Sequence, residues 1–378
     1  MDKSILILQK VHAAERMGGG PFQSYLAAKG LADLGWRVYF AAERGPRNKP
    51  LDKTFLDERI KNIWLTRVYN GLEWVHIMKL RRLVKKEEIS VYLTHIHTAL
   101  LGVLAFLQEK PIVYMNGSLS VCNGIPIWTK EDLGRLKTTK KLFYASYYWL
   151  YNYGFNKTSL VLAQTPMQDE LFRNNLNKKS VVYPGPSLLL EEETESVKLP
   201  QEPYILWIGN LVPGKRPEMF LDIVQAMPEQ RFVMVGGTWG KRYASSIKER
   251  ASKLPNLIDL EGINYRQSNT CVKHCILLLS TSDPIYEGFP NVFKEAWLHA
   301  KPVISMSAFP DRLIETERLG AIIEDKERVI AYLRSIVNNK NILEETGQRA
   351  RLFAEREYNL ERNSIYLDKL LTDLIGEG

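Results

Sequence analysis

Two glutamates flank the segment whose residue types and spacing best suit sugar chemistry. Glu287 precedes a turn, and Glu295 lies about one turn into a predicted helix that starts with Asn291 as its N-cap. A carboxylate accepts two hydrogen bonds from sugar hydroxyls, and a helix start directs N–H groups towards an anion such as a diphosphate. Alternatively, both are ordinary surface glutamates. The turn between Glu287 and the helix consists of Gly288, Phe289 and Pro290.

Three consecutive glycines, Gly18, Gly19 and Gly20, separate the first predicted strand from a predicted helix over residues 22–34. Glycine lets a backbone approach a phosphate closely and adopt a positive φ. The triplet is not the Gly-x-Gly-x-x-Gly dinucleotide fingerprint. We expect it to contact either the phosphate of a donor or the acceptor itself, and a generic loop is the alternative.

The remaining polar candidates are histidines and cysteines. His95 and His97 follow a predicted strand and could line a ligand site, although a structural role is the commoner one. Cys271 and Cys275, with the histidine between them, offer three ligands in one turn, whereas structural zinc takes four. We therefore expect both cysteines to be packing residues, and no metal site.

Short apolar runs alternate with segments of helical period, which is typical of parallel βα units. An acidic, proline-bounded linker divides them into two halves: a first domain over residues 1–186, a linker over 187–203, and a second domain over 204–360. Residues 361–378 are expected to form a helix that returns to the first domain. The predicted strands span residues 5–8, 37–41, 62–66, 90–94, 111–115, 159–163 and 180–183, then 204–208, 231–235, 257–260, 276–280, 302–306 and 320–323.

Composition narrows the class of protein. The 378 residues favour two domains at roughly 150 residues each. Three cysteines exclude a disulfide scaffold, and a net charge of +8 suits an anionic ligand or surface without indicating nucleic-acid binding. The apolar run after Lys3 is too short for a signal peptide, and the longest one, residues 99–107, is too short to cross a membrane. We expect a cytoplasmic protein.

Two segments combine basic and aromatic residues. Residues 79–86 form a predicted basic helix, and Lys137, Lys140 and Lys141 lead into an aromatic stripe at helical spacing. Such a composition suits the headgroup zone of an anionic membrane, so peripheral contact with the inner face of a membrane is one interpretation. A solvated basic face with inward-packed aromatic side chains is the other. The stripe consists of Phe143, Tyr144, Tyr147, Tyr148 and Tyr151.

The pair of glutamates belongs to a longer pattern. Residues 287–296 (EGFPNVFKEA) and 300–304 (AKPVI) resemble the nucleotide-sugar motif of the retaining glycosyltransferases of family 4, in which seven residues separate two glutamates before a Pro-Val-Ile strand. The resemblance covers nearly the whole chain in order and spacing. Its other parts are Gly18–Gly20 and residues 26–38, 160–165 (LVLAQT), 204–215 (YILWIGNLVPGK) and 232–237 (FVMVGG).

The resemblance implies a GT-B fold, two doubly wound Rossmann-like domains facing each other across a cleft. It implies a retaining hexosyltransferase whose co-substrate is a nucleotide-diphosphate sugar, UDP- or GDP-linked, without a metal. Glu295 would hold the ribose hydroxyls, Glu287 would contact the transferred sugar, and Lys215 would stabilise the diphosphate as negative charge develops. The remaining donor contacts it implies are Gly209, Asn210, Arg216, Gly288, Phe289, Pro290 and Asn291.

Two positions depart from the family pattern. Asn210 stands where many relatives carry arginine, and Arg216 could compensate for it. Asn116 occupies the place of a histidine that often follows the fifth strand, and an amide cannot take a proton at neutral pH. The expected acceptor side therefore consists of the glycine triplet, Asn116 and His97, and the leaving phosphate could accept the proton.

The sequence thus predicts transfer of a sugar to a hydroxyl of a glycan or lipid-linked acceptor, in the synthesis of cell-surface polysaccharide or glycoconjugates. Two alternatives stay open: a nucleotide-sugar epimerase or hydrolase on the same fold, and a non-catalytic nucleotide-sugar-binding subunit.

Overall fold

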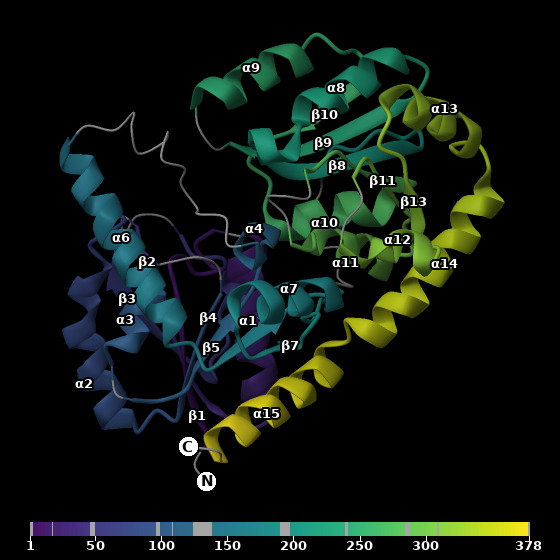
Figure 1. Ribbon diagram of the computed structural model, residues 1–378. Coiled ribbons are helices and arrows are strands. Elements are labelled where there is room, and N and C mark those ends of the chain that lie inside the picture. Colours follow the sequence, from purple (N-terminus) through teal and green to yellow (C-terminus); the bar gives the residue numbers. More distant parts are fainter. Residues whose placement is uncertain are drawn as a thin grey trace. The chain divides into compact units, whose positions relative to one another are not determined.

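The computed structural model describes residues 3–16, 18–45, 50–95, 99–107, 109–123, 138–189, 197–238, 241–283, 288–307 and 310–376. The chain forms two compact units (Figure 1). Unit 1 contains the residues up to Pro186 and those from Leu360 onwards, and unit 2 contains Ser187–Asn359. The chain therefore leaves unit 1 once and returns to it for its last helix.

Unit 1 is built on a parallel sheet, which in the described residues has seven strands in the order β3-β2-β1-β4-β5-β6-β7. The strands are largely buried, as expected where helices cover both faces of a parallel sheet. Their bounds are β1 Ser4–Gln9, β2 Arg37–Arg44, β3 Ile60–Thr66, β4 Val91–His95, β5 Ile112–Met115, β6 Leu160–Ala163 and β7 Ser180–Val182.

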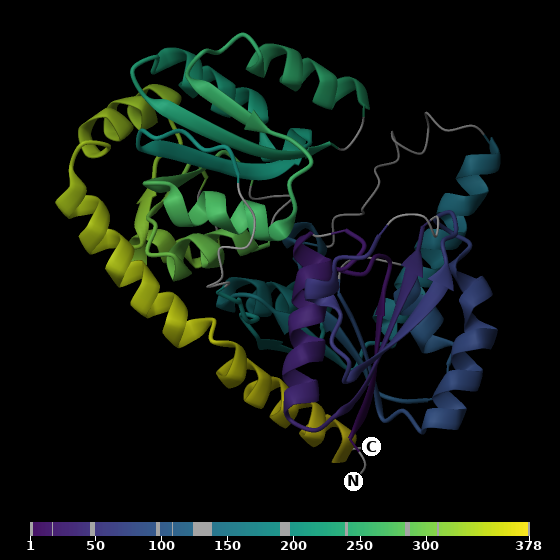
Figure 2. The same ribbon diagram turned by 180° about the vertical axis from the view of Figure 1, so that it is seen from behind.

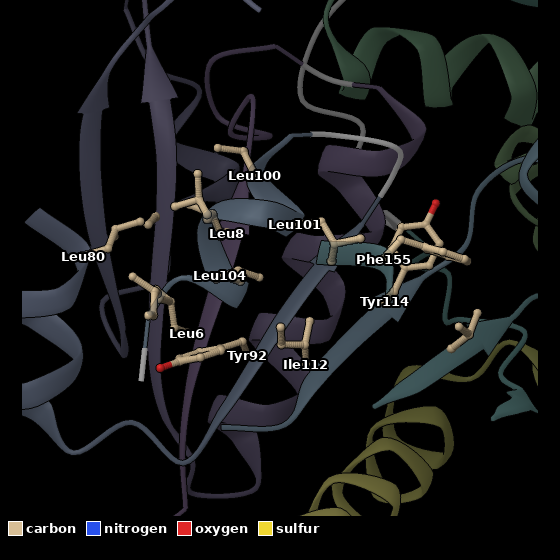
Figure 3. Packing of buried hydrophobic residues seen from close by; sticks show 14 of the residues in the cluster. Leu6, Leu8, Leu80, Tyr92, Leu100, Leu101, Leu104, Ile112, Tyr114 and Phe155 are labelled. Atoms are coloured by element: carbon tan, nitrogen blue, oxygen red, sulfur yellow. The ribbon is translucent and has the colours of Figure 1, made fainter. Parts of the chain in front are cut away.

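Alternate residues of β1 point into two different cores. Leu6 and Leu8 pack with residues of α2, α3 and α7 on one face, as Figure 3 shows for part of this cluster. Ile5 and Ile7 pack against α1 and α15 on the other. The helices of unit 1 are α1 Gly19–Asp33, η2 Glu73–His76, α2 Ile77–Glu87, α3 Leu100–Ala105, α4 Leu119–Cys122, α6 Thr138–Asn156, α7 Pro166–Leu176 and α15 Leu360–Gly376, with the short η1 Lys53–Phe55.

The last helix, α15, lies directly along α1 (Figure 2). A Cβ atom added at Gly30 of α1 would lie 1.8 Å from Ser364 Oγ, so glycine is what permits this approach. Asp368 accepts hydrogen bonds from Lys3 Nζ at 2.6 Å and from Trp36 Nε1 at 2.7 Å. The middle of α15 is thereby tied to the residues that directly precede β1 and β2.

Unit 2 has a second parallel sheet, with six strands in its described part, in the order β10-β9-β8-β11-β12-β13. Helices α8, α9 and α13 cover one face, and α10, α11 and α14 cover the other. The strands are β8 Tyr204–Leu211, β9 Arg231–Thr238, β10 Leu257–Leu260, β11 Leu277–Ser280, β12 Val303–Ser305 and β13 Gly320–Ile322. The helices are η3 Pro213–Lys215, α8 Pro217–Ala226, α9 Lys241–Ala251, α10 Tyr265–His274, α11 Asn291–Leu298, η4 Pro310–Arg312, α12 Leu313–Thr316, α13 Lys326–Ile336 and α14 Lys340–Glu357.

The strands predicted from the sequence are all confirmed within one to three residues at their ends. The largest differences are at β2, β8 and β9, which each run three residues further than predicted. β2 continues because its backbone pairing with β3 runs on to Arg44 and Thr66, and the buried Glu43 carboxylate on this extension is paired with Lys10. Cys271 and Cys275 lie in the core beside α11, as expected of packing residues. Among the described residues, no helix is both long and apolar enough to cross a membrane.

Candidate functional site

The loop that carries Lys215 is fixed to the end of the neighbouring strand. Thr281, which follows β11, donates from its Oγ1 to the Lys215 carbonyl at 2.8 Å and accepts from Trp207 Nε1 of β8 at 3.0 Å. The Asp283 N–H donates to the Gly214 carbonyl at 2.8 Å. Lys215 therefore begins from a defined backbone position at the carboxyl ends of two adjacent strands, where open α/β sheets bind ligands.

Arg216 fastens the same loop. It adopts a left-handed conformation (φ 45°), and its guanidinium donates to the carbonyls of Thr281 and Ser282 at 2.5 and 3.1 Å. A further bond reaches the Ser307 hydroxyl beyond β12. Through these contacts Arg216 positions the loop around Lys215. Its predicted contact with a donor stays a prediction.

Gly209 and Asn210 lie at the end of β8, beside Gly236 and Gly237 of β9. A Cβ atom at position 209 would lie 3.1 Å from the Trp207 ring and 3.4 Å from Lys215 Cδ, so glycine leaves room for the lysine side chain. The Asn210 side chain leans over Gly237, where a Cβ would meet its Oδ1 at 2.8 Å. Both residues thus lie near the carboxyl end of β8, just before the loop that carries Lys215.

The start of α11 differs from the sequence prediction by one residue. Asn291 is the first helical residue, and Pro290 holds the cap position with no side-chain hydrogen bond, so the prediction of Asn291 as N-cap is wrong. Pro290 has no N–H and a fixed φ, which suits the place before a first turn. The first turn contains no acidic residue. The N–H groups of the first turn thus meet no competing carboxylate from that turn.

The turn before α11 is anchored by aromatic packing. Gly288, Phe289 and Pro290 are buried, and the Phe289 ring lies 6.0 Å from Phe293, 5.8 Å from Trp297 and 6.1 Å from Tyr358, measured between ring centroids. This packing fixes the backbone that the sequence analysis assigned to the diphosphate.

Glu295 is a buried carboxylate, 8% exposed, one turn into α11. Burial raises its pKa to about 7, while the hydroxyl of Tyr265 and the charge of Lys294 act to lower it. Glu295 is therefore divided between its charged and neutral forms near neutral pH. Carboxylates with a strongly shifted pKa are common in functional sites, because catalysis and binding depend on the charge of such groups.

Lys294, next to Glu295, is fully buried. Its ammonium lies 4.9 Å from the centroid of the Tyr358 ring and 5.9 Å from that of Phe289. Burial lowers its pKa to about 7, opposed by the charge of Glu295. A helix position that faces the core thus carries a cation, which sequence periodicity alone did not single out.

Two predicted site residues, Glu287 and His97, lie outside the described residues. Their roles stay predictions. Two of the predicted donor residues, Lys215 and Arg216, are hydrogen-bonded to the segment 281–283 that follows β11. Glu295 lies further along the same stretch, on the helix that follows it.

In unit 1 the glycine triplet forms the start of α1. Gly18 caps this helix in an extended conformation (φ −176°), and Gly19 and Gly20 begin it. None of the three has a positive φ, so that part of the rationale for glycine does not apply here. A Cβ at Gly18 would meet only ordinary contacts, the nearest at 3.9 Å. The remaining rationale for glycine at these positions is that it leaves room for a ligand to approach the start of α1 closely.

Asn116 follows β5 and is 1% exposed. Its Nδ2 donates to Gln168 Oε1 at 3.0 Å and to Cys122 Sγ at 3.3 Å, and its Oδ1 accepts from the Ser118 N–H at 3.4 Å. The amide therefore braces the turn after β5 against α4 and α7. Its contact with an acceptor stays a prediction.

The sequence analysis missed a buried ionic network at the carboxyl ends of β1 and β2. Lys10 Nζ donates to Glu43 Oε1 at 3.0 Å and to Glu73 Oε1 at 2.9 Å, and His76 Nε2 lies 3.0 Å from Glu43 Oε1. The two carboxylates are fully buried. No sequence signal links these residues, because Lys10 and Glu43 are 33 positions apart along the chain and Glu43 and Glu73 are 30 apart. The backbone N–H groups that also reach the carboxylates belong to Val68 and Gly71, at 3.4 and 2.6 Å.

Tyr265, the first residue of α10, is the other residue that was missed. It interacts with Glu295 and lowers the pKa of that carboxyl. Thirty residues separate the two along the chain, and only the packing of α10 beside α11 brings them together.

Both units match sequence families. Residues 17–187 match the family described as Glycosyltransferase Family 4, and residues 202–339 match that described as Glycosyl transferases group 1. The chain is a family 4 glycosyltransferase. Enzymes of this class retain the anomeric configuration, and this one transfers a sugar from a nucleotide sugar. No protein with a curated description matches it by sequence.

The glycosyltransferase has the GT-B fold, as solved structures of low sequence identity show. Sucrose-phosphate synthase from Thermosynechococcus elongatus is 16% identical with a TM-score of 0.77, and the match covers 100% of both chains. Anabaena HepE in complex with UDP-glucose is 17% identical with a TM-score of 0.74, covering 98% of this chain and 99% of that one. A TarM variant from S. aureus, in complex with fondaparinux, α-GlcNAc-glycerol and UDP, is 14% identical with a TM-score of 0.69, covering 99% of both.

Proposed function

We propose that unit 2 of this glycosyltransferase binds a uridine-diphosphate sugar at the carboxyl ends of β8 and β11. The observation that carries the proposal is the hydrogen bond between Thr281 and the Lys215 carbonyl, followed by a helix, α11, whose first turn contains no acidic residue. Two of the similar structures are complexes with these ligands, HepE with UDP-glucose and the TarM variant with UDP. These support uridine over guanosine as the base.

Each donor residue has a task that its chemistry suits. The Lys215 ammonium offsets the charge that develops on the leaving diphosphate. Backbone N–H groups at Gly288, Phe289 and Asn291 donate to the phosphates, and Pro290 cannot. Glu295, when ionised, accepts from both ribose hydroxyls. Glu287 contacts the transferred sugar. Gly209 and Asn210 border the diphosphate, and Arg216 holds the loop.

The reaction needs no metal or protein base. The bond between the anomeric carbon and the diphosphate oxygen breaks, and a bond from the acceptor oxygen to that carbon forms on the same face. The acceptor proton passes to the departing phosphate oxygen. Gly18–Gly20, Asn116 and His97 of unit 1 present the acceptor hydroxyl, which belongs to a glycan or lipid-linked carrier of cell-surface polysaccharide or glycoconjugate synthesis.

The test incubates the purified enzyme with UDP- and GDP-sugars and a panel of glycan and lipid-linked acceptors. We expect UDP release and a product whose anomeric configuration, read by NMR coupling constants, equals that of the donor. Chelators should leave the rate unchanged. Free sugar or an isomerised donor as sole product would favour the hydrolase or epimerase, and no consumption of any donor would favour a non-catalytic subunit.

Two matched variants test the donor residues in the same assay. Lys215→Met removes the cation and should lower kcat about 10²- to 10³-fold, with a smaller loss for Lys215→Arg. Lys253→Met, at an exposed lysine two residues after the end of α9, should change neither kcat nor KM. Equal activity of Lys215→Met and wild type would contradict the role of Lys215.

A further inference from the structure

Exposed large hydrophobic side chains gather on one part of unit 1. Seven of the thirteen found among the described residues come from two short stretches, one around η2 and one in α6. Several are very exposed: Tyr69 by 84%, Met78 by 62%, Leu142 by 70% and Trp149 by 58%. Hydrophobic residues scattered singly need no explanation, but a group does. We name this group the η2–α6 face; it consists of Tyr69, Trp74, Val75, Met78, Leu142, Phe143 and Trp149.

Direct contacts join the two stretches into one surface. Ser146 Oγ of α6 donates to the Gly71 carbonyl at 2.8 Å. A Cβ at Gly71 would lie 2.0 Å from the Phe143 carbonyl oxygen, so glycine (φ 95°) lets the η2 loop lie against α6. Helices α2, α3 and α6 cover the same side of the sheet in both views (Figures 1 and 2).

The end of α3 connects α2 to the aromatic part of α6. Arg81 Nε of α2 donates to the Phe106 carbonyl at 2.8 Å. The Phe106 ring stacks on Trp149 and on Tyr153, with centroids 5.7 and 4.7 Å apart. Trp149 is thus held rigidly on its inner side while its outer side stays exposed.

The aromatic stripe predicted in α6 has two sides. Tyr147 is buried, and Tyr151 packs against the core beside Phe155. Phe143 and Trp149 face outward instead. The prediction that these aromatic side chains pack inward is therefore confirmed for Tyr147 and Tyr151. Trp149, which faces outward, was not part of the predicted stripe.

Basic side chains border this face. Lys79, Arg81, Arg82 and Lys85 of α2 are exposed, and none forms an ion pair with an acidic side chain in the described part of the chain. Lys79 and Arg81 donate instead to backbone carbonyls, which do not neutralise them. Lys140 and Lys141 of α6 are exposed as well. The surface thus combines protruding apolar groups with uncompensated positive charge.

We propose that the η2–α6 face binds the surface of an anionic lipid bilayer. The apolar side chains enter the headgroup zone, where tryptophan and tyrosine are favoured, and the lysines and arginines contact lipid phosphates. A second copy of this chain is a poor occupant, because pairing the face with itself would oppose two clusters of like charge. The proposal concerns unit 1 and is independent of the donor site.

The test is co-sedimentation of the full chain with vesicles of phosphatidylcholine, alone or mixed with phosphatidylglycerol. We expect binding to the mixed vesicles that weakens with added salt. Trp74→Ser/Met78→Ser/Trp149→Ser should lower the partition constant at least tenfold. Arg82→Gln/Lys85→Gln should lower it about 25-fold, since each basic residue near an anionic surface contributes about fivefold.

Matched controls lie elsewhere on the surface. Ile342→Ser/Leu352→Ser on α14 and Lys253→Gln/Lys369→Gln remove exposed residues of the same kinds, and should bind as wild type does. UDP binding and the melting temperature, measured on every variant, show whether the donor site and the fold are intact. Failure of the wild-type chain to sediment with mixed vesicles would overturn the proposal. So would a dimer, or a complex with a protein partner, that the same apolar variants abolish while vesicle binding persists.

Discussion

The side chain of Thr281 is bonded to the backbone of Lys215: its Oγ1 donates to the lysine carbonyl at 2.8 Å while accepting from Trp207 Nε1 at 3.0 Å. Thr281 is fully buried, so removing its hydroxyl would take one hydrogen bond from each of these two groups. One hydroxyl therefore sets the position of the residue that we assign to the diphosphate.

Thr281→Val keeps the shape of the side chain and removes its hydroxyl. We expect a loss of about 1–3 kcal/mol in the free energy of unfolding, because buried polar groups are left unsatisfied. The value of kcat/KM for the donor should fall about tenfold as the Lys215 loop loosens, which corresponds to roughly 1.4 kcal/mol. Thr281→Ser should keep most of both. Loss of stability without any change in kcat/KM would show that the bond does not serve catalysis.

Donor affinity should depend on pH through Glu295. Burial raises its pKa to about 7, and only the ionised carboxylate accepts from both ribose hydroxyls. The Kd for UDP, measured by calorimetry, should therefore fall as pH rises towards 7 and level off above it, changing about tenfold per pH unit on the acidic side. Glu295→Gln should bind more weakly above pH 7 and lose this dependence. A wild-type Kd that stays constant across the range would exclude Glu295 as the ribose ligand.

Lys294→Met should stabilise the protein. Burial lowers the pKa of Lys294 from 10.5 to about 7, so between these values the unfolded chain binds more protons than the native one, and stability rises with pH. Methionine removes that rise and should add about 1–4 kcal/mol at neutral pH, as when a buried charge is replaced by an apolar side chain. Urea unfolding over a pH series measures both effects. Lys301→Met, at a partly exposed lysine after α11, is the control and should show neither.

Asp368→Asn tests the attachment of α15. Burial alone would raise the pKa of Asp368, but the hydrogen bonds from Lys3 and Trp36 outweigh it and hold the pKa below 3.8. The stabilisation is thus present above that value and is lost as pH falls through the native pKa. We expect Asp368→Asn to cost about 1 kcal/mol at neutral pH and nothing in strong acid.

Asp373→Asn provides the comparison for α15, because Asp373 is exposed on the same helix. Its thermal denaturation should match that of the wild type at every pH. If Asp368→Asn and Asp373→Asn behave alike, the bonds to Lys3 and Trp36 contribute nothing measurable.

The alternation of buried strands and helices could be predicted from the sequence because it is a local property. Ile5 to Leu8 are apolar without interruption, as a strand covered on both faces requires. The ends of the strands were harder to predict from the sequence. β2 was expected to stop before Glu43, but its backbone pairing with β3 continues to Arg44 and Thr66, and the sequence alone does not show how far two strands stay paired.

The donor motif was recognisable because its residues lie close together along the chain, around Glu295. What surrounds it was not, since Tyr265 and Thr281 reach the site through tertiary packing. Arg216 illustrates the limit: its predicted contact with a donor stays a prediction, and the sequence did not show that its guanidinium is bonded to two carbonyls and a hydroxyl of its own domain. Residue type predicted an interaction, and only the fold identified the partner.

The return of α15 to unit 1 has a consequence for synthesis on the ribosome. The side of β1 formed by Ile5 and Ile7 is completed by Leu367 and Leu371, which are translated some 360 residues later. Until then that apolar surface is incomplete, although every strand of its sheet has long since emerged. Nascent chains arrested between α14 and α15 should accordingly be protease-sensitive in their earliest-made half, a vulnerable interval in which chaperones would find their substrate.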